Sequence, residues 1–153
     1  MIRRALFLVM LVAAGLACAA PAHAQILGVR AGVSADPDQF FIGGHIETPR
    51  LGEAKKASLR PNLEIGFGDD TTVVAGNLEL VYWVPLPDST WQLYFGGGPA
   101  VNYIHNDFDD HAHGGFNMLV GFQAASGLFI EMKVGVQNSP GLKGTVGYVF
   151  KGN

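Results

Sequence analysis

The chain has 153 residues, of which 48% are hydrophobic and 15% are charged, and 21 of them are glycine. Ten Lys and Arg residues against thirteen Asp and Glu residues give a net charge of −3, which argues against nucleic acid as a partner.

The first 24 residues have the three parts of a secretory signal peptide. A basic start is followed by an apolar stretch from Ala5 to about Ala20, and then by Ala22-His23-Ala24, which matches an A-x-A cleavage site. The apolar stretch is also short for a membrane-spanning helix. We therefore expect residues 1–24 to be removed on export and residues 25–153 to form one mature domain.

Cys18 is the single cysteine, and cleavage after Ala24 would remove it. The mature chain would then have no disulfide, so an exported fold must be held together by other interactions. A lipoprotein signal that uses Cys18 is an alternative, but Gly15 stands where such signals usually have Leu. We therefore favour ordinary export.

Eight segments of the mature chain alternate apolar side chains with small or polar ones, as β-strands with two different faces do. In chain order these segments are residues 26–34, 39–48, 59–68, 72–84, 91–104, 116–124, 128–137 and 142–150. Turn-forming residues separate most of them. Pro99 lies inside the fifth segment and predicts a bulge or a strand end there. No helical periodicity is evident, so the sequence predicts an all-β fold with antiparallel neighbours.

The two faces of the predicted strands differ in charge. One face carries no Asp, Glu, Lys or Arg, which suits lipid because a Lys or Arg at the middle of a bilayer costs roughly 2–4 kcal/mol. The other face is rich in glycine and carries charges of both signs in mid-strand, at Arg30, Glu64, Glu79, Glu131 and Lys133. Inside an eight-stranded barrel such charges must pair, and glycines make room for the other side chains. We therefore predict an eight-stranded antiparallel up-and-down transmembrane β-barrel, with these five residues forming a charge network that plugs its lumen.

Aromatic residues on the uncharged face sort into two levels if the strands alternate up and down from a periplasmic N-terminus. The outer level would contain Phe40, Phe67, Tyr103 and Phe116, and the inner level Tyr82, Trp91, Tyr148 and Phe150. Two such aromatic girdles flank the apolar band of membrane barrels.

This pattern resembles the eight-stranded outer-membrane barrels of Gram-negative bacteria, of the OmpA transmembrane domain and OmpX type, over essentially all of residues 25–150. The resemblance implies a location in the bacterial outer membrane, contact with its lipid and lipopolysaccharide, and a monomer. It also implies that the C-terminal strand, ending Tyr148-Val149-Phe150, is read by the barrel-assembly machinery. The chain differs from the family in its short turns after the first, third and seventh strands and in its long connection after the second.

No catalytic arrangement is evident. His45 stands alone on its predicted strand, and no Gly-rich phosphate loop precedes a helix. We therefore expect a structural, adhesive or surface-binding protein without catalysis and without a cofactor. Two alternatives stay open, a narrow pore and a soluble periplasmic lipocalin-like barrel that binds a small apolar ligand with its faces reversed.

The densest polar cluster is the predicted loop of residues 105–113. His105, Asp107, His111 and His113 are candidate metal ligands, because imidazoles bind borderline cations and carboxylates bind hard ones. Their spacing matches no established site, so we expect a solvated loop here.

Overall fold

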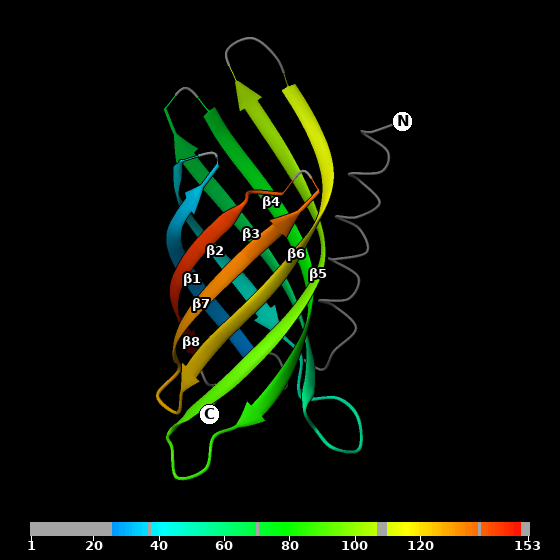
Figure 1. The fold of residues 1–153 in the computed structure, drawn as a ribbon, viewed down its shortest axis with the longest axis vertical. Coiled ribbons are helices and arrows are strands. Elements are labelled where there is room, and N and C mark those ends of the chain that lie inside the picture. The colour runs from blue at the N-terminus through cyan, green and yellow to red at the C-terminus, as the bar shows by residue number, and fades with distance from the viewer. Residues whose placement is uncertain (1–25, 37, 70, 107–109, 138, 151–153) are drawn as a thin grey trace.

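The computed structural model describes residues 26–36, 38–69, 71–106, 110–137 and 139–150. Eight strands form one closed antiparallel barrel, in which each strand pairs with its neighbours in sequence and β8 closes onto β1 (Figure 1). The strands are β1 (Ile26–Ala35), β2 (Gln39–Glu47), β3 (Ala57–Gly68), β4 (Thr71–Pro85), β5 (Trp91–Asn106), β6 (Asp110–Ala124), β7 (Leu128–Val136) and β8 (Leu142–Phe150). The predicted all-β, eight-stranded, up-and-down barrel is confirmed.

The expected signal peptide, residues 1–24, lies outside the described residues. Among the residues that are described, no helix is long and apolar enough to cross a membrane.

The two ends of the barrel carry different connections. The β1–β2, β3–β4, β5–β6 and β7–β8 connections lie at the end that we call the upper end, where β5 and β6 reach farthest (Figure 1). The β2–β3, β4–β5 and β6–β7 connections lie at the opposite, lower end, where β1 begins and β8 ends.

The expected loop at residues 105–113 is wrong in extent, because β5 and β6 continue into it. Asn102 pairs with His113, and Ile104 with His111, in the same register as the rest of the β5–β6 ladder. The connection between the two strands is residues 107–109, which are not described. Backbone pairing between β5 and β6 continues beyond the apolar band. The strand extension was not predicted because polar side chains lie on both faces there, so the sequence does not alternate between apolar and polar residues.

The predicted bulge or strand end at Pro99 is also wrong. β5 is continuous from Trp91 to Asn106, and its register with β4 is the same on both sides of the proline, at Asn77 with Ala100 and at Leu80 with Gly97. Pro99 lacks a backbone N–H, but its side chain points outward and is exposed, so the strand accommodates it without a change of register.

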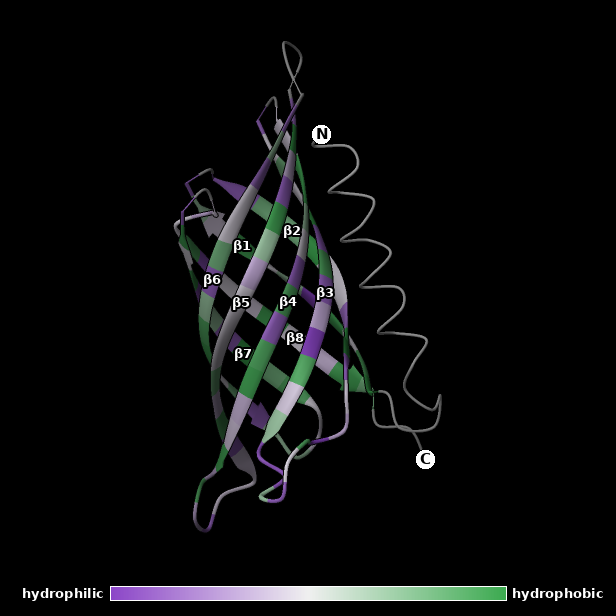
Figure 2. Cartoon of the chain, turned by 90° about the vertical axis from the view of Figure 1, so that its right-hand side faces the viewer, coloured by the Kyte–Doolittle hydropathy of each residue, from purple (hydrophilic) through white to green (hydrophobic). Residues whose placement is uncertain are grey.

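The outer surface is apolar around the whole barrel. Large exposed hydrophobic side chains occur on all eight strands, with Val33 62% and Met118 58% exposed, for example. Every Lys, Arg, Asp and Glu of the strands whose side chain is described is instead buried in the lumen. Figure 2 shows the resulting alternation of hydrophobic and hydrophilic residues along each strand. A barrel that holds an apolar ligand would instead have an apolar lumen and a polar outer surface.

Glycines on the inner face lie where a side chain would not fit. A Cβ atom at Gly98 would overlap the carbonyl oxygen of Leu78 on β4, and one at Gly96 would overlap that of Leu80. Outward-facing Gly76 is different, because a Cβ atom there would meet nothing within 4 Å. The β4 and β5 backbones therefore approach each other more closely on the inner face than a side chain would allow.

Gly98→Ala should destabilise the barrel by about 1–3 kcal/mol, because the methyl group would have to displace the β4 backbone. Gly76→Ala should change the free energy of unfolding by less than about 0.5 kcal/mol. Urea titration of each variant, refolded in detergent micelles, measures the difference. Equal destabilisation by both substitutions would contradict the close inner contact.

Candidate functional site

The lumen is filled by side chains, with ionised groups at its centre. Its buried charged residues come from β1, β2, β3, β4, β7 and β8 and are Arg30, Arg60, Lys133, Lys143, Glu47, Glu64, Glu79 and Glu131. Four are basic and four are acidic, so among the described residues the charges in the lumen balance. Balance matters because a buried charge without a partner is strongly unfavourable.

Glu131 on β7 accepts hydrogen bonds from three side chains. Its carboxylate lies 3.4 Å from Arg30 Nη1, 3.0 Å from Arg60 Nη1 and 3.0 Å from the Tyr94 hydroxyl. Gly121, the cross-strand neighbour of Glu131, makes the Tyr94 contact possible, since a Cβ atom at Gly121 would overlap the tyrosine ring. Two basic groups and one hydroxyl therefore surround this carboxylate.

Glu64 on β3 is the second centre of the network. It lies 3.2 Å from Arg30 Nη1, 3.2 Å from Lys133 Nζ and 2.7 Å from Lys143 Nζ. Lys133 Nζ also lies 2.6 Å from Glu79 Oε1. The structure thus brings the five predicted charges into one continuous chain of contacts, in the order Glu131, Arg30, Glu64, Lys133 and Glu79.

Three further charged residues, Arg60, Glu47 and Lys143, lie nearer the ends of their strands and belong to the same network. Arg60 donates to Glu47 at 3.0 Å as well as to Glu131, and Lys143 reaches Glu64. The alternation of the sequence indicates that these three residues face the lumen, but it does not indicate how high in the lumen they lie. Arg60 pairs directly with Glu79 in the β3–β4 register, and that register could not be read from the position of Arg60 within its own segment.

A chain of asparagine amides lies beside the ionic network. Asn117 on β6 donates to Asn77 on β4, which donates to Asn62 on β3, each at 2.7 Å between Nδ2 and Oδ1. β5 separates β4 from β6, and its residue opposite Asn117 is Gly98, which has no side chain to block the first of these bonds. All three asparagines are buried on the inner face, and nothing in their spacing along the sequence indicates that they interact.

Aromatic rings and an arginine fill the lower mouth of the lumen. The rings of Trp83 and Tyr94 lie 4.8 Å apart, and Trp83 donates its indole N–H to Ser58 at 2.9 Å. Arg50, from the β2–β3 connection, lies 4.5 Å from the centre of the Trp83 ring and donates to Gln92 at 2.5 Å. Burial lowers the pKa of Arg50, an effect that nearby Glu47 opposes.

The upper part of the lumen contains a small cavity, and a larger hollow of about 630 Å³ opens above it at the rim, lined by residues that include Ser34, Gln39 and Asp69. A cavity of about 10 Å³ is lined by residues that include Ser34, Phe41, Glu64 and Lys143. This volume is about that needed for one water molecule, so it offers no room for a solute.

His45 lies in the lumen and contacts the charge network. Its Nδ1 accepts from Arg30 Nη2 at 3.2 Å, and its ring packs edge-on against Phe129 with 5.5 Å between centroids. The imidazole therefore lies between a guanidinium and an aromatic ring, and these contacts are those of a side chain that fills space in the lumen.

The candidate metal ligands do not converge. The rings of His111 and His113 lie 6.0 Å apart on one face of β6, whereas His105 lies on the opposite face of the β5–β6 pair. Asp107 lies outside the described residues. In the described ranges, no three His, Cys, Asp or Glu side chains come close enough together to hold a metal ion.

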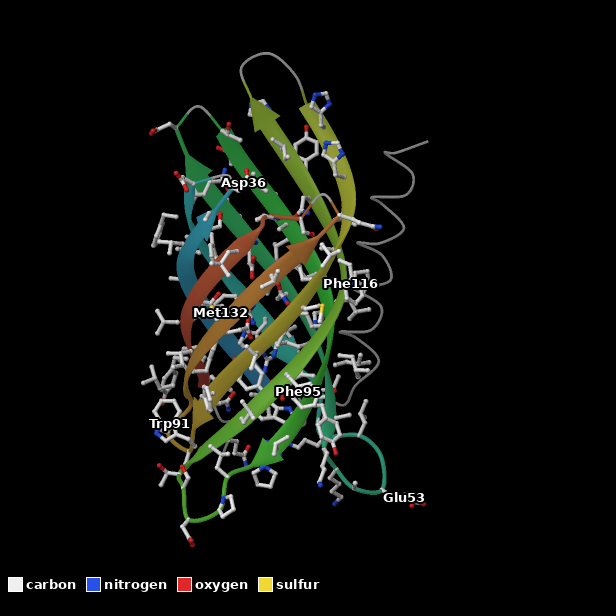
Figure 3. The ribbon with its side chains drawn as sticks, in the orientation of Figure 1. Asp36, Glu53, Trp91, Phe95, Phe116 and Met132 are labelled. Atoms are coloured by element: carbon white, nitrogen blue, oxygen red, sulfur yellow. The ribbon has the colours of Figure 1, made fainter. Side chains whose placement is uncertain are left out.

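The predicted girdle aromatics lie on the outer surface. Phe40 and Phe67 are direct cross-strand neighbours, and Tyr148 and Phe150 have ring centroids 5.4 Å apart. The other six exposed or half-buried outward aromatics are Tyr82, Trp91, Tyr103, Phe116, and two that the prediction omitted, Phe95 and Phe122. Figure 3 shows Trp91 and Phe95 near the lower end and Phe116 farther up, well below the tip of the β5–β6 hairpin.

Glu131→Ala should destabilise the barrel by about 3–5 kcal/mol, because it leaves Arg30 and Arg60 buried with one carboxylate fewer. Thermal unfolding in detergent micelles, followed by circular dichroism, measures the loss. The control is Glu53→Ala, which removes an exposed carboxylate and should change stability by less than about 0.5 kcal/mol. Equal stability of the two variants would show that the lumen charges do not depend on one another.

No protein-family model and no curated protein sequence matches the chain. Among solved structures, the crystal structure of the N-terminal β-barrel domain of Pseudomonas aeruginosa OprF is similar, with a TM-score of 0.58 and 15% sequence identity. The match covers 84% of this chain and 98% of that domain. This chain therefore has the eight-stranded barrel fold of the OprF N-terminal domain, as the resemblance to the OmpA-type barrels predicted.

Proposed function

We propose that the chain is an outer-membrane β-barrel protein whose lumen is closed to solutes, and that it has a structural, adhesive or surface-binding role without catalysis. Its partners would be outer-membrane lipid and lipopolysaccharide, and the barrel-assembly machinery through β8.

The observation that carries this proposal is the uncharged, exposed apolar surface on all eight strands. Monomeric soluble proteins rarely expose a continuous apolar patch of more than a few hundred Å². Here the apolar surface follows the whole circumference of a closed barrel, which leaves no unpaired strand edge. A closed barrel with this outer face satisfies both requirements of the bilayer, paired backbone groups and an apolar exterior.

Closure of the lumen to solutes is supported by how its charges are matched. The carboxylates of Glu64 and Glu131 each have three donors from other strands, and the asparagine and aromatic side chains occupy the space beside them. Opening a path would require breaking several buried ion pairs together, each of which is costly to separate. This favours a plugged lumen over the narrow pore.

A non-catalytic role is supported by the surroundings of His45, the described histidine that is buried in the lumen. His45 accepts from Arg30 and packs against Phe129, so within the described residues its contacts are not those of a general base beside a nucleophile.

Val134→Arg should reduce stable membrane insertion, because Val134 is 47% exposed on the apolar face, where an arginine costs up to roughly 2–4 kcal/mol at mid-bilayer and less toward the interface. Gln137→Arg is the matched control, since Gln137 follows the end of β7 and is exposed at the upper end. Cells expressing each full-length variant are fractionated, and membrane samples are compared by cold and boiled gel electrophoresis. We expect a stronger heat-dependent mobility shift for the control than for Val134→Arg. Equal insertion of both variants would contradict a lipid-facing position for Val134.

The parent protein should give no discrete current steps in planar lipid bilayers, because its lumen is filled. The same protein in vesicles must show the heat-dependent gel shift, which establishes that it is folded. Regular single-channel steps from folded protein would contradict the plug and support the narrow pore.

A further inference from the structure

The exposed basic side chains of the described residues all lie at one end of the barrel. Among the described side chains outside the lumen, the basic ones are Arg50, Lys55 and Lys56, and all three belong to the β2–β3 connection at the lower end. The upper-end connections contain Asp36, Asp38 and Asp69, and by sequence no upper-end connection contains a Lys or Arg. The lower-end connections also contain Glu53 and Asp88, so their described residues carry three positive and two negative charges, a net charge of +1, whereas the described residues of the upper-end connections carry only negative charge. An anion is therefore favoured at the lower end over the upper end.

The base of the β2–β3 connection, residues 48–56, is tied to the barrel by backbone and side-chain contacts. Leu51 forms an isolated bridge with Ala57, with its N–H 2.6 Å from the Ala57 carbonyl oxygen. Lys55 N–H donates to the Gly52 carbonyl at 3.1 Å, which closes a turn. Arg50 is engaged with Trp83 and Gln92. Figure 3 shows this connection, marked by Glu53, projecting from the lower end.

Lys55 and Lys56 differ from Arg50 in that neither lysine side chain contacts a ring or forms a hydrogen bond with another described residue. Both side chains are exposed, and no ion pair among the described residues includes either of them. Their ammonium groups are therefore available to an external anion.

Outward-facing aromatic rings lie close to these lysines. The residue after Lys56 is Ala57, which pairs with Tyr82, and the Tyr82 ring lies 5.5 Å from that of Phe95. The backbone carbonyl of Lys56 accepts a hydrogen bond from the backbone N–H of Trp83 at 2.7 Å, which fixes the Lys56 backbone beside β4. At about 3.3 Å per residue along a strand, Lys55 and Lys56 begin within roughly 7 Å of the level of Tyr82. Tyrosine at the edge of an apolar band marks the depth of lipid headgroups.

We propose that Lys55 and Lys56 bind the phosphate headgroup of an anionic phospholipid in the leaflet at the lower end of the barrel. The apolar surface around Tyr82 and Phe95 would contact the acyl chains of the same lipid. This combination of an apolar surface with adjacent ammonium groups fits a lipid better than a water-soluble polyanion. A polyanion would bind the ammonium groups but would gain nothing from contact with the apolar surface. The proposal rests on the membrane-spanning function proposed above.

Relative affinity for phosphatidylglycerol over phosphatidylcholine tests the proposal. The full chain, with Trp91→Phe and Phe95→Trp to place a fluorescent reporter beside Tyr82, is refolded into vesicles containing either lipid in brominated form. The other tryptophan, Trp83, is buried in the lumen and gives the same background in both lipids. Brominated chains quench a tryptophan that they contact, so the quenching at each lipid ratio gives the relative binding constant. We expect a preference for phosphatidylglycerol that weakens as salt is added.

Lys55→Gln with Lys56→Gln in this reporter protein should lower the phosphatidylglycerol preference roughly fivefold or more, given the usual attraction of a lysine to an anionic membrane surface. Glu53→Gln is the matched control, because it changes a charge of opposite sign in the same connection. It should leave the preference unchanged or raise it.

Two failures are distinguishable. Absence of the heat-dependent gel shift in phosphatidylcholine vesicles would overturn the membrane-spanning function itself. A folded, inserted barrel that shows no phosphatidylglycerol preference, or the same preference after both lysines are replaced, would overturn only the headgroup site.

Discussion

The pairing of four basic and four acidic side chains inside the lumen is the constraint on which the rest of the barrel depends. A buried ion pair contributes little net stability compared with an apolar pair, but a buried charge that loses its partner is strongly destabilising. The contacts between Arg30, Glu64 and Glu131 join β1, β3 and β7, which are not neighbours in the sheet. They therefore penalise any arrangement of strands that would separate them, and so favour a single register around the barrel.

Filling a narrow barrel with long charged side chains requires space, and the inner glycines provide it. Gly96 and Gly98 let β4 and β5 approach each other, Gly121 leaves room for Tyr94, and Gly28 leaves room for His45. Each of these glycines costs conformational entropy and gives up possible side-chain packing. That cost is offset because the space admits the partners that the ionic network needs. The same strands expose their other side chains, so the apolar exterior and the charged interior follow from one alternation.

Alternation was sufficient to predict eight strands, their antiparallel order and the face of each charged residue. It could not give the height of a side chain within the lumen, because height depends on the register between strands. Arg60 shows this, since its pairing with Glu79 brings it to the centre of the network. His111 and His113 were expected in a loop because both faces of the β5–β6 hairpin are polar there. The packing of Arg50 on Trp83 joins a connection to a strand and has no periodic signal at all.

Balanced charges in the lumen have a consequence for the outside of the molecule. Because the described lumen residues contribute no net charge, the remaining charge of the described residues lies at the two ends. Among the residues whose side chains are described, the upper-end connections carry Asp36, Asp38 and Asp69, while the lower-end connections carry Arg50, Lys55 and Lys56 against Glu53 and Asp88. These residues give the two ends charges of −3 and +1. A barrel with an apolar wall and this distribution would interact differently with the headgroups on the two sides of a bilayer, because its upper end repels anions that its lower end attracts.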